Sequence, residues 1–210
     1  MKHVLFLTSL LLVMTLGLKA QSDVYLSAMK NGLANLDTLQ SNNSFISAAN
    51  TFERIAEAEP EEWLPLYYAA YTRLLGGVTA QNKDTQDALY DQALASLKKA
   101  EIIMPNNSEI YALKGYALYM KMAVDPMERY QSIASAEKEL EKALAINPSN
   151  PRVYLIRGQN KFYTPETYGG GKDAAKPLLL KAKELFETSK PAHELDPHWG
   201  KERTLYLLNQ

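Results

Sequence analysis

One spacing of small and large residues recurs four times along the chain, three times with a helix-ending proline after it, and restricts the fold more than any other feature. Each copy places a large apolar residue four positions after an alanine, and a further apolar residue three positions after that. These two steps follow one face of a helix. In the first three copies a proline stands five positions later, where its ring and missing N–H end the helix. The copies are Ala48–Pro60, Ala93–Pro105, Ala136–Pro148 and Ala175–Glu187.

A second spacing follows each proline and predicts a partner helix. A large residue stands six positions after the proline, and a small residue stands ten positions after it. Small residues let two helix backbones approach closely, and large residues fill the space between helix pairs. The chain is therefore expected to be all-α and built from helical hairpins. The large residues are Leu66, Tyr111 and Tyr154, and the small ones are Ala70, Gly115 and Gly158.

Together the two spacings resemble the tetratricopeptide repeat, a hairpin of two helices that stacks into arrays. The resemblance implies an all-α, right-handed α-solenoid of about four hairpins, closed by a C-terminal capping helix. One repeat domain would then occupy residues 21–210. Its expected hairpins are residues 23–60, 61–105, 108–148 and 150–189, followed by the cap at 190–210.

The chain departs from that family in the length of its units. Its prolines stand 45 and 43 residues apart, against about 34 in the consensus. The surplus is expected between paired helices, in GGVTAQNKDTQ, AVDPMERYQS and FYTPETYGGGK. The first helix, about residues 23–39, fits least, with Gly32 and Leu36 at the large and small positions, as in a terminal repeat. The residues expected to cover the other end are Trp199, Leu205 and Leu208.

Residues 1–20 have the layout of a secretory signal peptide, with Lys2, an apolar stretch and Ala20 before the cut. An uncleaved anchor is the alternative, although the apolar stretch is shorter than the about 20 residues of a spanning helix. No later stretch is apolar enough to span a membrane, and the chain has no cysteine, which agrees with an oxidising compartment. The sequence predicts export across the inner membrane to the periplasm, without stable membrane insertion after cleavage.

The glycine run at residues 169–171 raises the question of a phosphate-binding loop. That loop requires G-x-x-x-x-G-K-[ST]. Here Lys172 is followed by Asp173, and Glu166 stands where the first glycine would be. The run is therefore expected to be a connector, in which glycines supply positive φ angles.

Other chemistry has little support in the sequence. The formal net charge of −1 indicates no basic face for nucleic acid. His193 and His198 are separated by Pro197 and lack the H-E-x-x-H spacing of a zinc helix. No cysteine and no G-x-S-x-G motif offers a nucleophile. We expect no catalytic, cofactor-binding or metal site, and no enzymatic activity.

The tyrosines provide the strongest binding hypothesis. In the tetratricopeptide family the first helix of each hairpin lines a groove that receives peptides or helices. Tyrosine suits such a groove because it offers a large contact area and a polar tip. The alternative is that several of these side chains pack between repeats. The groove positions implied by the resemblance are Tyr67, Tyr71, Glu109, Tyr116, Tyr119, Arg152, Gln159 and Phe162.

Two binding functions follow from these patterns. The first is a non-enzymatic scaffold or adaptor of the bacterial cell envelope that binds a protein or peptide. The alternative is a small-molecule or lipid-binding component of a periplasmic transport system, with the long connectors folded over a pocket. The connectors also form a candidate recognition surface, whose expected residues are Thr164, Pro165, Tyr168, Gly169, Gly170 and Gly171.

Overall fold

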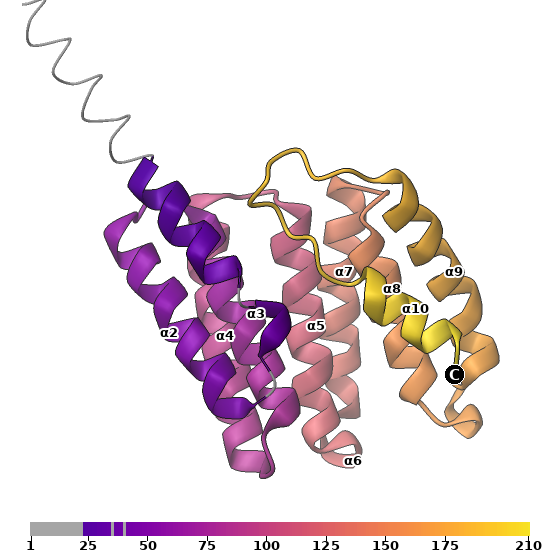
Figure 1. Cartoon of the computed structure of the whole chain (residues 1–210). Coiled ribbons are helices and arrows are strands. Elements are labelled where there is room, and N and C mark those ends of the chain that lie inside the picture. The colour runs from indigo at the N-terminus through magenta and orange to yellow at the C-terminus, as the bar shows by residue number, and fades with distance from the viewer. Residues whose placement is uncertain (1–22, 35, 40) are drawn as a thin grey trace, which may run out of the picture.

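The protein is a row of antiparallel helices followed by a segment that returns across the row (Figure 1). The computed structural model describes residues 23–34, 36–39 and 41–210, and there is no strand among them, which confirms the expected all-α class. The signal peptide predicted at residues 1–20 lies outside the described residues. The α-helices are residues 23–33, α2 (Asn42–Ala58), α3 (Trp63–Thr79), α4 (Lys83–Ile103), α5 (Ser108–Val124), α6 (Pro126–Arg129), α7 (Ile133–Ile146), α8 (Pro151–Tyr163), α9 (Lys172–Thr188) and α10 (Lys201–Leu208).

Consecutive helices pack as the spacings indicate, with α3 on α4, α5 on α7 and α8 on α9. A Cβ atom added to Gly115 of α5 would lie 2.5 Å from the Leu140 side chain of α7. One added to Gly158 of α8 would lie 2.7 Å from the Leu179 side chain of α9. The small residue of one spacing therefore receives the large residue of the other, and both positions need glycine because any side chain would displace its neighbour.

A contact of the same kind, between a glycine and a large side chain of the paired helix, corrects the register of the first unit. A Cβ atom on Gly32 would lie 2.8 Å from the ring of Phe52 in α2. Gly32 thus holds the small position of this unit. The register expected from the sequence has Gly32 at the large position and Leu36 at the small one, and it is wrong by four residues. The helix ends at residue 33, short of the expected residue 39, and the chain continues through the 3-10 turn Leu36–Thr38.

Asparagines cap the helices that follow Pro105 and Pro148, whereas Glu62 before α3 makes no side-chain capping hydrogen bond. The Asn107 side chain accepts hydrogen bonds from the backbone N–H groups of Glu109 and Ile110, and the Asn150 side chain accepts from that of Arg152. Such caps satisfy N–H groups that have no partner within the helix. They fix the start of α5 and α8, which carry most of the groove residues named below.

The three expected inserts differ from one another. Most of GGVTAQNKDTQ is helical, because α3 continues to Thr79 and α4 begins at Lys83. The expected long connector is therefore wrong there, and longer helices take up the surplus. The second insert holds α6 and the 3-10 turn Tyr130–Ser132, and Arg129 pairs with Asp87 of α4.

The third insert is a self-bonded connector rather than a phosphate loop. The backbone N–H of Gly171 donates to the carbonyl of Lys161 (2.9 Å), and Gly171 has a φ of 96°, in the region that favours glycine. The connector contains the 3-10 turn Glu166–Tyr168 and leads into α9. Its backbone donors are thus turned toward the protein's own carbonyls.

After α9 the chain turns back, and we call residues 189–200 the return segment (Figure 1). Leu195 is buried in the core of the first half, where its carbonyl accepts a hydrogen bond from Tyr68 of α3 (2.9 Å). α10 then packs on α9 and α8. Trp199, expected to cover the end of the array, instead lies between Tyr71 of α3 and Tyr116 of α5.

Candidate functional site

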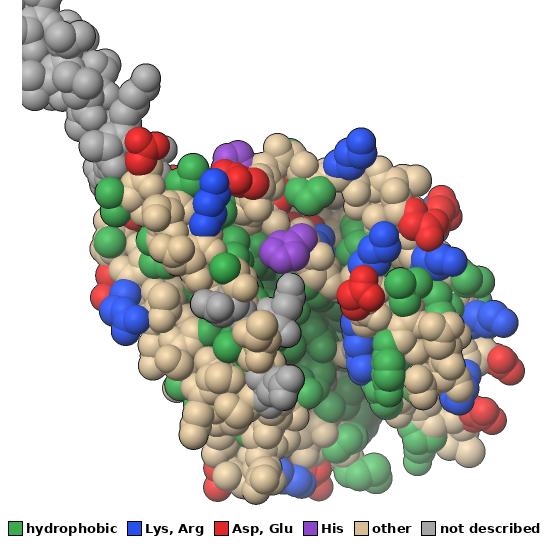
Figure 2. Space-filling model, in the orientation of Figure 1, with side chains coloured by type: hydrophobic (Ala, Val, Ile, Leu, Met, Phe, Trp, Pro, Cys, Tyr) green, Lys and Arg blue, Asp and Glu red, His purple; other side chains and the backbone are tan. Residues whose placement is uncertain are grey.

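A groove of about 550 Å³ opens between the row of helices and α10. Its walls come from α3, α5, α8, the end of the return segment and the start of α10, and they are mostly apolar. Figure 2 shows a hollow on this face with hydrophobic side chains in its walls. The aliphatic residues of the lining include Leu75, Val78, Met120, Ala123, Leu155 and Ile156.

Aromatic rings form much of the remaining lining. Trp199 stacks on Tyr71 with 4.7 Å between ring centroids and 16° between planes, and on Tyr116 at 6.3 Å and 25°. Tyr119 and Tyr163 complete this set. Flat rings offset from one another in this way provide a surface suited to a planar, apolar ligand.

Three tyrosine hydroxyls of the groove are bound by neighbouring side chains. Gln159 donates from its amide to the hydroxyl of Tyr116 (3.0 Å), and Arg203 donates to the carbonyl oxygen of Gln159 (2.7 Å). Arg203 also donates to the hydroxyl of Tyr163 (2.8 Å). The hydroxyl of Tyr119 donates to Glu137 of α7. Burial raises the pKa of Tyr116 and of Tyr119, so both remain neutral phenols at physiological pH.

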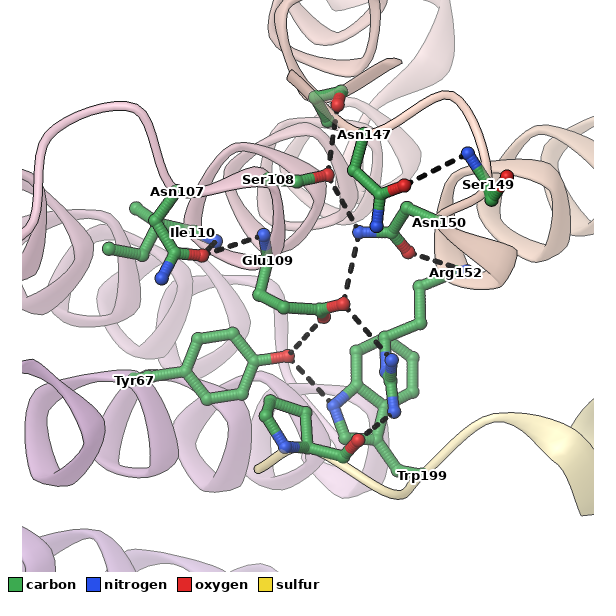
Figure 3. Close-up of polar contacts among 12 residues, drawn as sticks. Tyr67, Asn107, Ser108, Glu109, Ile110, Asn147, Ser149, Asn150, Arg152 and Trp199 are labelled. Atoms are coloured by element: carbon green, nitrogen blue, oxygen red, sulfur yellow. Dashed lines mark hydrogen bonds and ion pairs between the residues drawn. The ribbon is translucent and has the colours of Figure 1, made fainter. Parts of the chain in front are cut away.

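Beside the groove lies a buried polar network that holds the return segment (Figure 3). Glu109 of α5 pairs with Arg152 of α8 (3.1 Å), and it accepts from Tyr67 (3.4 Å) and Asn150 (3.0 Å). Arg152 donates to the carbonyl of Pro197 in the return segment and lies 5.1 Å from the ring centroid of Trp199. The network therefore links α3, α5 and α8 to the segment that covers them.

Burial also shifts the titration of this network. It raises the pKa of the Glu109 carboxyl above its ordinary value, whereas the nearby Arg152 guanidinium and the Tyr67 hydroxyl oppose that shift. Burial raises the pKa of Tyr67 well above its ordinary value, with Glu109 adding to the effect. Tyr67 consequently stays protonated, and its oxygen can accept the indole N–H of Trp199 at 2.9 Å.

The structure gives the eight residues expected in a groove three different placements. Tyr71, Tyr116, Tyr119 and Gln159 line the groove together. Tyr67, Glu109 and Arg152 belong to the network under the return segment and do not line it. Phe162 packs against the ring of Tyr163 (5.1 Å between centroids), which takes the lining position in its place.

Several groove residues could not be found from the repeat positions. Trp199 and Arg203 belong to the C-terminal region, which carries no copy of either spacing. Leu155 and Ile156 stand four and three positions before the expected Gln159 on α8. They lie on the same face of that helix, so the helical period, though not the repeat positions, would have predicted them. Residues 190–210 hold only Trp199 and Tyr206 as Phe, Trp or Tyr residues and are no richer in them than the whole chain, so no local signal in the sequence places Trp199 in the groove.

The expected connector surface keeps one large exposed side chain. Tyr168 is 75% exposed, while the neighbouring Gly170 is bound through its N–H to the carbonyl of Pro165. At the helix start, Lys172 donates to the backbone carbonyl of Gln210, which ties the connector to the end of α10. Thr164 turns inward by donating to the carbonyl of Asn160, and Gly169 and Gly171 adopt positive φ angles.

The described part of the chain holds neither a candidate metal cluster nor a candidate membrane-spanning helix. No group of three or more His, Cys, Asp or Glu side chains in that part of the chain could hold a metal ion. No helix there is both long and apolar enough to cross a membrane.

Comparison with known proteins gives one solved structure of direct interest. No family model matches the chain, so the tetratricopeptide repeat remains a resemblance of spacing. No curated protein matches either. The HusA haemophore from Porphyromonas gingivalis aligns with a TM-score of 0.77 and 34% sequence identity, over 88% of this chain and 90% of its own. Because sequence and fold agree over nearly the whole of both chains, this chain belongs to the family of the HusA haemophore.

Proposed function

We propose that the chain is an exported, non-enzymatic haem-binding protein that holds the tetrapyrrole in the groove beside Trp199. The observation that carries this proposal is the groove itself, which has about 550 Å³ of space and mostly apolar, aromatic walls. Sites for small ligands commonly enclose about 300–1,000 Å³ and combine such walls with a few polar groups. The relative at 34% identity is a haemophore, which fits the same class of ligand.

This proposal favours the small-molecule alternative over a peptide scaffold. The return segment already lies against the face of α3 and α5 where a peptide was expected, with Trp199 stacked on Tyr71 and Tyr116. A bound peptide would have to displace that segment from Tyr67, Tyr68 and Arg152. The open part of the groove is wide enough for a small ligand without that cost. Residues 1–20 support export, and a periplasmic or extracellular site of action is part of this proposal.

The lining favours contact with the faces of the macrocycle over coordination of its metal. The described lining residues include no histidine or cysteine. Tyr116 and Tyr119 are neutral phenols whose hydroxyls are occupied, and Met120 offers only a soft thioether. The tyrosine, tryptophan and aliphatic side chains supply stacking and burial instead.

Metal-free protoporphyrin IX should therefore bind about as tightly as haem. We expect dissociation constants within about threefold of each other, since less than about 1 kcal/mol would come from the metal. Absorbance and tryptophan-fluorescence titrations of the purified mature chain would measure both. Binding of haem with no binding of the metal-free ring would contradict face-on binding, and failure of both would reject the proposed function.

A bulky substitution would locate the ligand in the groove. Ala123 is exposed and lines the groove near the end of α5, so Ala123→Trp should fill the space without removing a core contact. We expect at least a tenfold loss of porphyrin affinity, about 1.4 kcal/mol. Ala134→Trp, at an exposed position of α7 outside the lining, is the matched control and should keep full affinity. Equal affinity in both variants would place the ligand elsewhere.

A further inference from the structure

Arg203 is the one charged side chain among the described residues that line the groove. It comes from α10, and its guanidinium is fixed from two sides, by Gln159 through Nε (2.7 Å) and by Tyr163 through Nη2 (2.8 Å). The rings of Tyr163 and Tyr206 flank it, at 5.7 Å and 5.2 Å from their centroids. A guanidinium held in this way is oriented before any ligand arrives.

The charge of Arg203 is not neutralised by a carboxylate. Four of the six arginines of the chain form ion pairs, and within the described residues Arg203 forms none. The described groove lining holds no aspartate or glutamate that could approach it. A cation at the edge of an apolar cavity, without an acidic partner, attracts an anionic group more strongly than one in open water. The four paired arginines are Arg73, Arg129, Arg152 and Arg157.

We propose that Arg203 is a specificity-determining residue that binds a carboxylate arm of a planar ligand whose ring lies in the groove. The inference rests on the proposed function, because it assumes that a tetrapyrrole occupies this cavity. A guanidinium presents forked N–H donors that match a carboxylate, and such charge-assisted hydrogen bonds are about twice as strong as neutral ones. The groove therefore selects ring ligands that carry an acid side chain over equally large neutral rings.

The test compares protoporphyrin IX with its dimethyl ester, which has the same ring but carries neutral methyl esters in place of the two carboxylates. The mature protein should bind the diacid at least about tenfold more tightly than the diester, and added salt should weaken only the diacid. Arg203→Gln should lower diacid affinity about tenfold and leave diester affinity within about twofold. Arg203→Lys keeps the positive charge but loses the forked N–H donors of the guanidinium. This variant should therefore keep part of the preference for the diacid over the diester.

Lys201→Gln is the matched control for loss of one positive charge. Lys201 is exposed on the same helix and does not line the groove, so this variant should bind both ligands as the unaltered protein does. Equal affinity of the unaltered protein for diacid and diester would overturn the role of Arg203 and leave the proposed function standing. Equal loss of both ligands in Arg203→Gln would show that the residue only shapes the groove. Failure of both ligands to bind the unaltered protein would reject the proposed function, and this inference with it.

Discussion

Trp199→Ala should lower the free energy of unfolding by about 3–5 kcal/mol, the usual cost of removing a large aromatic side chain from a packed site. Trp199 packs against each of the three hydrophobic clusters found among the described residues, so its loss removes contacts from all of them. The substitution also removes the stacked contacts with Tyr71 and Tyr116 and the hydrogen bond to Tyr67. Urea unfolding followed by circular dichroism would measure the change.

Two companion variants show which part of Trp199 matters. Trp199→Phe keeps a ring against Tyr71 but loses the N–H donor, and it should cost less than the alanine substitution. His198→Ala, at the exposed neighbouring position, should change stability by no more than about 0.5 kcal/mol. A loss below about 1 kcal/mol for Trp199→Ala would mean that the return segment contributes little to the fold. In porphyrin titrations, Trp199→Ala should also lose at least tenfold in affinity, because a stacked wall of the groove is gone.

Arg152→Met should be comparably damaging, at about 3–5 kcal/mol, because it leaves the Glu109 carboxylate buried without its cation. The Arg152 side chain is 7% exposed and that of Glu109 is 20% exposed, so water replaces little of the lost interaction. The variant also loses the hydrogen bond to Pro197 and the contact with the Trp199 ring. Denaturant unfolding at pH 7 would measure the loss, and a cost below about 1 kcal/mol would contradict a buried, paired site.

The dependence on pH separates the charge effect from the packing effect. Burial already raises the pKa of Glu109, and Arg152 opposes that shift, so removing Arg152 should raise this pKa further. A carboxyl whose pKa is higher in the folded state than in the unfolded state adds most to the free energy of unfolding below its unfolded pKa. It loses that contribution as the pH rises through its folded pKa. The difference between Arg152→Met and the unaltered protein should therefore be smallest in acid and grow toward neutral pH. The double variant Glu109→Gln, Arg152→Met should remove this pH dependence, and a difference independent of pH would indicate packing alone.

The fold could be predicted from the sequence because its determinants are local. The alanine, large residue and proline spacing fixes one helix of each hairpin, and Gly115 and Gly158 fix how closely its partner approaches. Both patterns can be read within a window of a few helical turns. The register of the first helix failed because Gly32 has no proline before it to count from.

The site could be predicted only in part, because three of its lining residues, Trp199, Gly200 and Arg203, come from the C-terminal region. Tyr71, Tyr116 and Tyr119 follow from the repeat positions and do line the groove. Trp199 and Arg203 lie in a region without periodicity, and no local rule says where a tail will pack. The same tail explains why Tyr67 and Arg152 are buried. An exposed groove was expected there, and the return segment covers it.

The return segment also changes how the chain must reach its final structure. In stacked repeats each unit contacts only its neighbours, so such arrays can fold from any point and lose units one at a time. Here Leu195 and Trp199 bond to Tyr68 and Tyr67, at sequence separations of 127 and 132 residues. Contacts of such high contact order form slowly, since a long loop must close before they form. We therefore expect the return segment to dock late, after Leu195 and Trp199 have been made, and its contacts with Tyr68 and Tyr67 to couple the unfolding of the first hairpins to that of the C-terminal region.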